Sequence, residues 1–395
     1  TVAAVITAVA WVLIGGHTTD FVLERIVTVL VIACPHALGL AIPLVVAIAT
    51  ERAARGGVLV KDRLALEAMR TVDAVLFDKT GTLTKGEPEV TAIEPAAIYT
   101  VKDVLALAAA AEAESEHPLA KAIIKHVGSK TLVGSNFSSS PAVGVSATVD
   151  GRQVQVGGPA LLTQTGATEL SIAEAWRTEG AIILHVLVEG RVAGAIKLVD
   201  AIRSESKQAV RALHSQGIKV AMVTGDAEAV AQSVAAELGI DRVFAGVKPA
   251  DKAAKVRELQ IEGLKVAMVG DGVNDAPALA QADVGIAIGA GTDVAIASAG
   301  VILASSDPRS VLSVISLSKH SYQKMKQNLW WAAGYNIVSV PLAAGILAPF
   351  GFILPMSVGA VLMSLSTVVV AANAQLLRRI DLRPEASIRE VMGVK

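Results

Sequence analysis

The heptapeptide DKTGTLT, residues 78–84, follows directly on the apolar run AVLF at residues 74–77. A short apolar run that ends in a carboxylate is typical of a buried strand whose carboxyl end opens onto a ligand site. Asp78 carries a carboxylate that can act as a nucleophile. The turn after it can offer backbone N–H groups to an anion, and Gly81 allows close approach. The stretch therefore predicts an anion-binding turn beside a nucleophilic carboxylate.

Similar strand-like runs recur downstream and alternate with helical stretches. The segments VAMVTGD (220–226) and VAMVGDG (266–272) are near copies, and each ends in glycine and aspartate. Strands that alternate with helices form a parallel sheet, and ligands bind beyond the carboxyl ends of its strands. We therefore expect Asp78, Asp226 and Asp271 to converge on one site. Further strands are expected at 284–289 and 301–307, and helices at 203–216 and 228–238.

A segment with a different pattern, residues 91–198, interrupts this alternation. VSATVDGRQVQV (145–156) alternates in polarity around Asp150-Gly151, which is a strong hairpin signal. We predict that the segment forms a separate α+β lobe inserted into the parallel sheet. The lobe is expected to contain also a second hairpin at 185–196, a helical stretch at 102–127 and a serine-rich link at 135–141.

Hydrophobic residues concentrate at both ends of the chain. They make up 53% of the 395 residues, and the mean hydropathy of +0.55 is too high for an ordinary soluble enzyme. A net charge of −1 gives no reason to expect a nucleic-acid partner, and one cysteine excludes an internal disulfide framework. Because a spanning helix needs about 20 apolar residues, we predict an integral membrane protein. The apolar runs cover roughly 1–16, 24–50, 328–349 and 352–376.

Basic residues beside these runs predict their orientation. Lys and Arg follow the second run, precede the third and follow the fourth, whereas the links at 17–20 and 349–351 have none. By the positive-inside rule, the middle segment of about 60–315 and both chain ends lie in the cytoplasm. The first run begins at Thr1 without the pattern of a signal peptide. We take it as the tail of a helix whose beginning is missing.

Four motifs occur in the order and spacing of one family. DKTGT, TGD, VKPADK and GDGVNDAPAL together resemble the phosphorylation motifs of P-type ATPases, which share the haloacid-dehalogenase fold. The resemblance implies that Asp78 takes a phosphoryl group from ATP. It also implies Mg²⁺ held by Asp78, the Thr80 carbonyl and Asp271, and Mg²⁺ prefers such oxygen ligands. Further catalytic roles are implied for Lys79, Thr80, Thr224 (phosphoryl contact), Gly225, Asp226, Lys248 (charge neutralisation), Asn274 and Asp275.

The inserted lobe carries SEHPLA (115–120), which resembles the nucleotide-binding signature of the heavy-metal P-type ATPases. The resemblance implies that this lobe binds ATP, with the histidine close to the adenine. Ala142 stands where the family has the first glycine of a Gly-x-Gly motif, so we expect its methyl group to crowd the phosphate chain. The implied nucleotide-binding residues are Glu112, His117, Gly144 and Gly157.

The tripeptide Cys34-Pro35-His36 lies in the middle of the second apolar run. Proline breaks a helix, and broken helices form ion sites in many transporters. Thiolate and imidazole suit soft or borderline metals, and a histidine inside a span is functional by default. The tripeptide, an Asn-x6-Tyr-Asn-x4-Pro pattern from Asn328 and a Met-Ser-x-Ser-Thr pattern resemble the CopB-like copper subgroup. The implied ligands of the transported ion are Cys34, His36, Tyr335, Asn336, Met363 and Ser364.

The resemblance extends only to the C-terminal portion of this family. The Thr-Gly-Glu motif of the actuator domain does not occur in the sequence. We therefore expect an N-terminal half with the actuator domain to be missing, and the chain alone to be unable to complete a transport cycle. The implied organisation is two transmembrane helices at 1–58 (the first truncated), a phosphorylation domain at 59–90 and 199–318, a nucleotide-binding domain at 91–198, two transmembrane helices at 319–380 and a cytoplasmic tail at 381–395.

The function that these features favour is ATP-driven export of copper (Cu⁺ or Cu²⁺) or Ag⁺ across the plasma membrane, with a copper chaperone as a candidate donor. A membrane-tethered phosphatase of the same fold group is an alternative, but such enzymes commonly carry Asp two residues after the nucleophile, where this chain has Thr80. A metal-binding scaffold or sensor with a degenerate ATPase domain is another, supported by Ala142. The last alternative is a pump for a different soft metal such as zinc.

Overall fold

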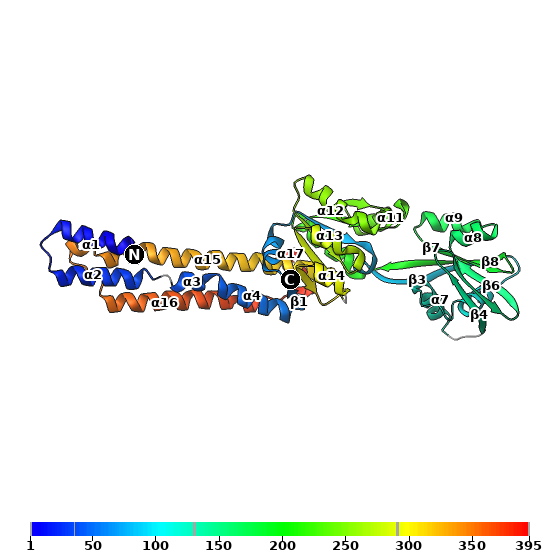
Figure 1. The fold of residues 1–395 in the computed structure, drawn as a ribbon, viewed down its shortest axis with the longest axis horizontal. Helices are drawn as coiled ribbons and strands as arrows, with labels where there is room; N and C mark the ends of the chain where they lie inside the picture. The colour runs from blue at the N-terminus through cyan, green and yellow to red at the C-terminus, as the bar shows by residue number, and fades with distance from the viewer. Residues whose placement is uncertain (1, 35, 129–131, 290–291, 394–395) are drawn as a thin grey trace. The chain divides into compact units, whose positions relative to one another are not determined.

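The chain divides into a mainly helical unit and an α/β unit (Figure 1). The structure, a computed structural model, describes residues 2–34, 36–128, 132–289 and 292–393, without the side chain of Val273. The helical unit comprises Thr1–Arg70 and Ser313–Ser387, and the α/β unit comprises Thr71–Leu312 and Ile388–Lys395. The borders at residues 70 and 312 therefore differ somewhat from the domain borders expected at 58 and 318.

A parallel sheet lies at the centre of the α/β unit. Within this unit its strands are ordered β13-β12-β11-β2-β9-β10, and all pairings between them are parallel. The middle strands are almost continuously apolar and buried, as expected for a parallel sheet covered on both faces. The strands predicted from the apolar runs are thereby confirmed. Their bounds are β2 (Ala74–Asp78), β9 (Lys219–Val223), β10 (Arg242–Phe244), β11 (Val266–Gly270), β12 (Val284–Ile288) and β13 (Val301–Leu303).

Helices pack on this sheet through their apolar faces. Val256 and Leu259 of one helix and Leu279 of another bury against Leu76 and Met268 of the central strands. The helices predicted at 203–216 and 228–238 are confirmed as α10 and α11. The set consists of α10 (Ser204–Ser215), α11 (Glu228–Leu238), η3 (Pro249–Asp251), α12 (Lys252–Ile261), η4 (Val273–Asp275), α13 (Ala276–Gln281) and α14 (Asp293–Ser298).

An antiparallel sheet, in the order β3-β8-β7-β6-β5-β4, forms the inserted lobe. The two predicted hairpins are confirmed, because Asp150-Gly151 and Glu189-Gly190 occupy their turns with positive φ angles. Helix α6 packs on one face of the sheet through Val104, Leu107 and Ala108. The elements are β3 (Thr84–Pro95), α6 (Val101–Ala111), α7 (Pro118–Val127), β4 (Gly134–Ser140), β5 (Gly144–Val149), β6 (Arg152–Gly157), α8 (Pro159–Thr165), α9 (Ile172–Thr178), β7 (Ile182–Val188) and β8 (Arg191–Ile202).

Two local predictions in this lobe were wrong. The helical stretch at 102–127 is two helices, because the backbone of His117 is extended (φ −65°, ψ 141°) and Pro118 starts a new helix. The serine-rich link at 135–141 contains β4, which pairs antiparallel with β5 at the edge of the sheet. Serine-rich sequence has no apolar periodicity, so only the pairing with β5 reveals that strand.

The helical unit consists mainly of long apolar helices. Two stretches, Thr19–Arg55 and Met356–Arg379, are long and apolar enough to cross a membrane. Among the described residues, the runs expected at 1–16 and 328–349 do not meet that criterion. The elements are α1 (Val2–Ile14), α2 (Thr19–Ile32), α3 (His36–Ala41), α4 (Pro43–Arg55), β1 (Val58–Val60), α5 (Arg63–Ala68), η1 (Met69–Thr71), α15 (Ser310–Ala344), η5 (Ala348–Phe350), α16 (Met356–Gln375), η6 (Leu376–Arg379) and α17 (Pro384–Met392).

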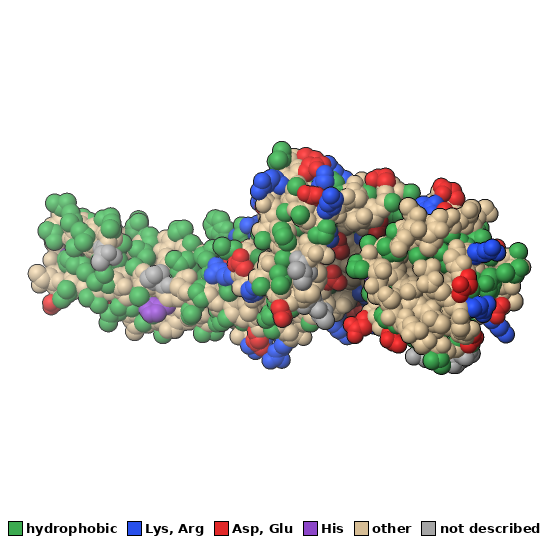
Figure 2. All heavy atoms as spheres, turned by 45° about the vertical axis from the view of Figure 1, so that its right-hand side comes forward, with side chains coloured by type: hydrophobic (Ala, Val, Ile, Leu, Met, Phe, Trp, Pro, Cys, Tyr) green, Lys and Arg blue, Asp and Glu red, His purple; other side chains and the backbone are tan. Residues whose placement is uncertain are grey.

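Large hydrophobic side chains cover the surface of these helices (Figure 2). Inside, polar side chains tie the helices together: the Arg25 guanidinium donates to the Leu354 carbonyl (2.7 Å) and the Trp11 indole to the Ala344 carbonyl (2.7 Å). Arg25 is fully buried. A surface this apolar around buried polar contacts is what a lipid environment requires, because lipid offers backbone groups no hydrogen bonds.

Candidate functional site

The carboxyl ends of β2 and β11 bring three carboxylates together. Asp78 ends β2, Asp271 follows β11, and Asp275 lies one turn further on. Oxygen atoms of these three side chains lie within 4.8 Å of one another. Three convergent carboxylate oxygens are a ligand set that suits Mg²⁺. Asp78 and Asp271 thus lie close together, as expected from the sequence, and Asp275 belongs to the same cluster.

A lysine neutralises this cluster, but it is not the one that the motif suggested. Lys252 Nζ lies 2.5 Å from Asp78 Oδ1 and 2.6 Å from Asp275 Oδ1, and its side chain is buried. Lys248 is exposed. The assignment of charge neutralisation to Lys248 is therefore corrected to Lys252, the second lysine of VKPADK. Lys252 opens α12, and side chains in a helix lean toward its N-terminus, which here faces the strand ends.

Burial and mutual repulsion shift the ionisation of these groups. Burial, together with the charge of Asp275, raises the pKa of Asp78 to about 7, although Lys252 acts in the opposite direction. Burial also raises the pKa of Asp271. For Lys252, burial lowers the pKa, but the carboxylates of Asp78 and Asp275 outweigh that effect and the net pKa is raised. The site is thus short of positive charge, and a divalent cation would compensate for that shortage.

The turn after Asp78 fits closely against the loop that carries Asp271. Gly81 has φ +76°, and a Cβ on it would lie 2.0 Å from Asp271 Oδ2. Glycine is therefore required there on two counts, backbone conformation and space. Thr82 in the same turn is fully buried, and its hydroxyl has no hydrogen-bond partner within the described chain. An unpartnered buried hydroxyl in the turn that follows Asp78 is a candidate to bind an incoming phosphate oxygen.

The Thr224-Gly225-Asp226 triplet follows β9, which pairs with β2 so that Val223 lies opposite Asp78. Thr224 is buried, and its Oγ1 accepts a hydrogen bond from the Asp226 N–H (3.1 Å). Asp226 forms an ion pair with the buried Lys79. Lys79 therefore links the turn after Asp78 to the triplet, and Asp226 serves that link instead of joining the three-carboxylate cluster.

Among the remaining predicted catalytic residues, Gly225 is exposed and Asn274 lies in the short helix η4. Thr80 and Asn274 have exposed side chains. Two residues that the sequence analysis missed support the turn from β8 and the residues after it. Arg203 donates to the Gly81 carbonyl (3.1 Å), and Asp200 accepts hydrogen bonds from the Thr84 hydroxyl (2.5 Å) and the Gly86 N–H (3.0 Å). A carboxylate and a guanidinium three positions apart at the end of a strand were the signal that could have identified them.

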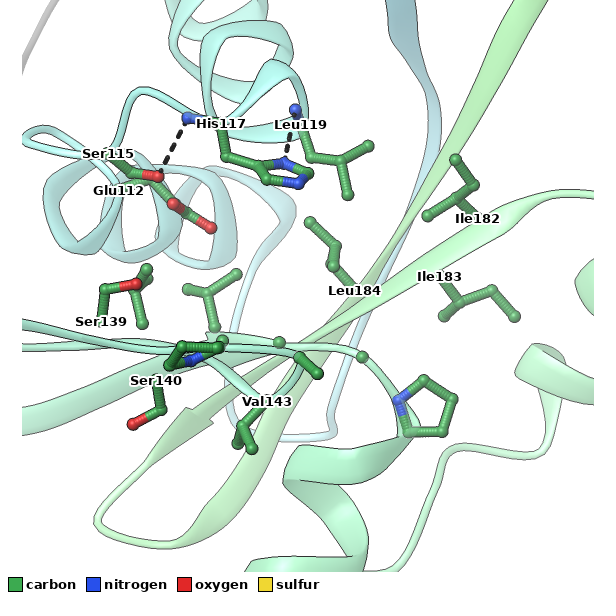
Figure 3. Close-up of a pocket in the computed structure, with 18 of the residues that line it drawn as sticks. Glu112, Ser115, His117, Leu119, Ser139, Ser140, Val143, Ile182, Ile183 and Leu184 are labelled. Atoms are coloured by element: carbon green, nitrogen blue, oxygen red, sulfur yellow. Dashed lines mark hydrogen bonds between the residues drawn. The ribbon is translucent and has the colours of Figure 1, made fainter. Parts of the chain in front are cut away.

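A cavity of about 490 Å³ in the inserted lobe contains all four predicted nucleotide-binding residues, namely Glu112, His117, Gly144 and Gly157 (Figure 3). Its volume lies in the range of ligand pockets, which is about 300–1,000 Å³. The walls are largely apolar, with Leu184 among the side chains that face the cavity. The cavity therefore has the size and character of a small-molecule site.

Glu112 and His117 supply polar groups to this cavity. Glu112 is buried, one of its oxygens has no partner among the described residues, and burial raises its pKa, partly offset by a hydrogen bond from Ser115. His117 caps α7, where its Nδ1 accepts a hydrogen bond from the Leu119 N–H (3.2 Å) (Figure 3). An accepting Nδ1 leaves the ring proton on Nε2, so His117 offers a donor and Glu112 an acceptor.

The two glycines are needed by the sheet itself. Gly144 and Gly157 pair directly between β5 and β6, and a Cβ on either would lie 2.1–2.2 Å from a carbonyl oxygen of the facing strand segment. Ala142 has φ +63°, the left-handed conformation that glycine adopts without strain. Alanine thus takes the backbone shape of the glycine it replaces, and its methyl group lines the cavity.

In the helical unit the helix that contains Cys34 and His36 is interrupted. Helix α2 ends at Ile32 and α3 begins at His36, so the predicted break is present, while Pro35 lies outside the described residues. Cys34 Sγ lies 3.9 Å from His36 Nε2. Both side chains are exposed, so the described residues of this chain do not enclose an ion between them.

The other predicted ion ligands lie on α15 and α16. The Tyr335 hydroxyl donates to the Gly359 carbonyl (3.5 Å), and the Ser364 hydroxyl donates to Ala360 of its own helix (3.0 Å). Asn336 Oδ1 is buried without a partner among the described residues, and Met363 is half-buried. Within the described chain, no side-chain hydrogen bond joins these four to Cys34 or His36.

A second interruption, between α3 and α4, is closed by residues that the ligand prediction left out. Asn328 is fully buried and donates to the Ala41 carbonyl (3.3 Å), and Asn373 donates to Asn328 Oδ1 (2.8 Å). Lys324 completes the chain of contacts with a hydrogen bond to Asn373 (2.9 Å). The Asn328 amide thus supplies a hydrogen bond to a backbone carbonyl at the break, which lipid could not supply.

Comparison with known proteins shows to which family this chain belongs. The model of the haloacid dehalogenase-like hydrolases matches residues 72–283, more than half of the chain. The chain belongs to this family, in its P-type ATPase branch. It is 50% identical over 91% of its length to a copper-exporting P-type ATPase B of Archaeoglobus fulgidus, and 44% identical over 95% to one of Enterococcus hirae. The chain spans about half the length of these curated relatives, 52% and 51% respectively.

Solved P-type ATPase structures share the fold. A zinc-transporting PIB-type ATPase in the E2.Pi state aligns with a TM-score of 0.81 at 32% identity, over 96% of this chain and 62% of that one. The catalytic domain of the CPx-ATPase CopB-B, studied on nucleotide binding, aligns with a TM-score of 0.57 at 31% identity. That alignment covers 68% of this chain and 98% of the domain. The fold expected from the sequence, a haloacid-dehalogenase-like P-type ATPase with membrane helices, is confirmed.

Proposed function

We propose that this chain carries the phosphorylation, nucleotide-binding and ion-binding parts of an ATP-driven copper or silver exporter, and that Asp78 is its phosphorylated residue. The observation that carries the proposal is the buried cluster of Asp78, Asp271 and Asp275 around Lys252. The names of the copper-exporting relatives support the choice of ion. Residence in the plasma membrane and delivery by a copper chaperone belong to the same proposal.

In the proposed reaction, an Asp78 carboxylate oxygen attacks the γ-phosphorus of ATP. The bond from that phosphorus to the bridging oxygen breaks, and ADP leaves with the electron pair. Lys252 offsets negative charge at the nucleophile, while Thr82, Thr224 and the backbone of the turn offer hydrogen bonds to the phosphoryl oxygens. Mg²⁺, when bound by Asp78, Asp271 and Asp275, with the Thr80 carbonyl as a further candidate, would supply additional charge neutralisation.

The absence of an acid next to the nucleophile supports a pump over a phosphatase. Thr80 stands two residues after Asp78, where phosphatases of this fold group commonly carry Asp. Threonine protonates a leaving group poorly, so the aspartyl-phosphate is expected to persist. Persistence is what an ion pump needs, because the phosphoenzyme must outlast the conformational step.

The cavity of the inserted lobe is proposed to bind the adenosine part of ATP. Glu112 would accept a hydrogen bond from the exocyclic amine of adenine, and the apolar wall would contact the purine face. Guanine presents a carbonyl instead of that amine, so the same carboxylate would disfavour GTP.

The transported ion is proposed to bind at the break between α2 and α3. Cys34 and His36 supply a thiolate and an imidazole, and the unpartnered Asn336 Oδ1 and the Met363 thioether are candidates to complete the site. Sulfur ligands favour Cu⁺ or Ag⁺. Zinc remains a second candidate because a zinc-transporting structure shares the fold at a TM-score of 0.81.

The deciding experiment is labelling of the purified chain with γ-³²P-ATP, followed by acid quenching. We expect an acid-stable label that hydroxylamine removes and that Asp78→Asn abolishes. Lys248→Ala, at an exposed lysine of the same motif, serves as the matched control and should label normally. Equal labelling of wild type and Asp78→Asn, or no label in either, would refute the assignment. Dependence of the label on Cu⁺, Ag⁺ or Zn²⁺ separates the candidate ions.

A further inference from the structure

Arg177 is a residue of the nucleotide cavity to which neither the motifs nor the phosphorylation chemistry assigns a role. Among the described residues that line the cavity, it is the only Lys or Arg. Ala181 and Ile182, which lie just after it in the chain, line the cavity as well. Glu112 is an acid, and the other lining residues carry no fixed charge. Arg177 is therefore the one fixed positive charge among the described residues that line the cavity.

The backbone next to Arg177 is held firmly at the rim of the cavity. Helix α9 ends at Thr178, the Gly180 N–H bonds to the Arg177 carbonyl (3.1 Å), and the Ala181 N–H bonds to the Trp176 carbonyl (3.0 Å). β7 begins immediately afterwards at Ile182, whose side chain lies at one side of the cavity (Figure 3). The attachment point of the guanidinium is thus fixed with respect to the cavity wall.

Two carboxylates of different character hold the guanidinium. Glu169 accepts from Nη2 (2.5 Å) and is itself mostly buried, with its Oε1 3.2 Å from Nε2 of the fully buried His185. Glu174 accepts from Nη1 (2.6 Å), but its side chain is 75% exposed. An exposed ion pair within a helix contributes little free energy, so a ligand can displace Glu174 easily. Glu169, which is mostly buried, keeps the guanidinium in place meanwhile.

A guanidinium has five N–H donors in a planar fork that matches phosphate oxygens. Two of them are used by Glu169 and Glu174, which leaves donors free for a ligand. We propose that Arg177 binds the phosphate chain of the nucleotide, with Glu169 as its positioning residue. The inference rests on the proposed function, because it takes the cavity to be the nucleotide site, and it adds the group that recognises the anionic part.

The experiment compares ligands that differ only in phosphate. Affinities of the full chain in detergent are measured by titration calorimetry for ATP, ADP, AMP and adenosine. Arg177→Ala should weaken ATP and ADP about tenfold, the loss expected for a charge-assisted hydrogen bond, and leave adenosine within about twofold. Arg177→Lys should be intermediate, because the ammonium keeps the charge but loses the fork. Arg191→Ala, at an exposed arginine of the same lobe, is the matched control.

A second variant, which keeps the arginine, should change the affinity for ATP in the opposite direction. Glu174→Gln should tighten ATP about twofold, because it releases the guanidinium from its exposed partner. Equal losses for ATP and adenosine in Arg177→Ala would mean that Arg177 only supports the cavity, and unchanged affinities would exclude contact; either result overturns the inference alone. Wild type that binds neither ATP nor adenosine would overturn the proposed nucleotide site itself, and the inference with it.

Discussion

Lys252 and Lys248 lie four residues apart in one motif, yet of the two only Lys252 contacts Asp78, the proposed nucleophile. We predict that Lys252→Ala lowers the rate of phosphoenzyme formation by about 10²-fold or more, the scale found when a preorganised charge-stabilising group is removed. Lys248→Ala should change this rate less than threefold, because a solvent-exposed charge contributes little. Single-turnover labelling measures both. Similar losses in the two variants would contradict the geometry of the site.

The raised pKa of Asp78, about 7 instead of the usual 3.8, predicts how Mg²⁺ binding depends on pH. Below that pKa the carboxyl group keeps a proton that Mg²⁺ must displace, so affinity should rise by up to about tenfold per pH unit and level off above pH 7. Calorimetric titration of Mg²⁺ between pH 5.5 and pH 8 measures this. In Asp78→Asn the rise should be much smaller.

The same shift has a consequence for stability without Mg²⁺. The folded-state pKa lies above the unfolded value, so between about pH 4 and pH 7 the folded state binds more protons than the unfolded state. The contribution of Asp78 to stability is therefore fully present below about pH 4 and is lost as pH rises to 7. Thermal unfolding of wild type against Asp78→Asn should show this slope, and excess Mg²⁺ should reduce it.

At the scale of elements, the loop between β4 and β5 contains an alanine in a glycine conformation. Ala142 has φ +63°, so Ala142→Gly should stabilise the chain by about 1 kcal/mol. Gly144→Ala, two residues away, should destabilise it by several times that amount, because the new Cβ would meet the Val156 carbonyl at 2.1 Å. Chemical denaturation of the full chain measures both, and a destabilising Ala142→Gly would contradict the argument.

At the scale of the whole molecule, the break between α2 and α3 is expected to bind a soft ion through the thiol of Cys34 and the imidazole of His36. We predict that Ag⁺ binds the purified chain and that Cys34→Ser weakens it by at least about tenfold, since the thiolate is the strongest soft ligand present. His36→Ala should weaken it less. His17→Ala, at a histidine stacked on Phe21, should have no effect. X-ray absorption with sulfur absent from the first coordination sphere of wild type would refute the site.

Much of this molecule could be read from local sequence. Apolar runs that end in aspartate predicted the strands β2, β9 and β11, because a strand buried on both faces must be continuously apolar. Asp150-Gly151 predicted a hairpin because few residues adopt its positive φ angles. The motifs identified the family and predicted Asp78 as the nucleophile, since each motif lies within a few consecutive residues.

Other features depended on contacts between distant segments. β4 is a strand because β5 pairs with it, and Lys252 reaches Asp78 because α12 starts with its first turn facing the strand ends. Asp275 joins the carboxylate cluster, and Arg177 lines the cavity of the inserted lobe, through the packing of helices on sheets. Sequence alone thus determined which chemical groups are present and most of the strands and helices, because these follow from local composition and periodicity. Only the tertiary structure decided which of those groups meet, because the direction of a side chain is set by the element that carries it and by what that element packs against.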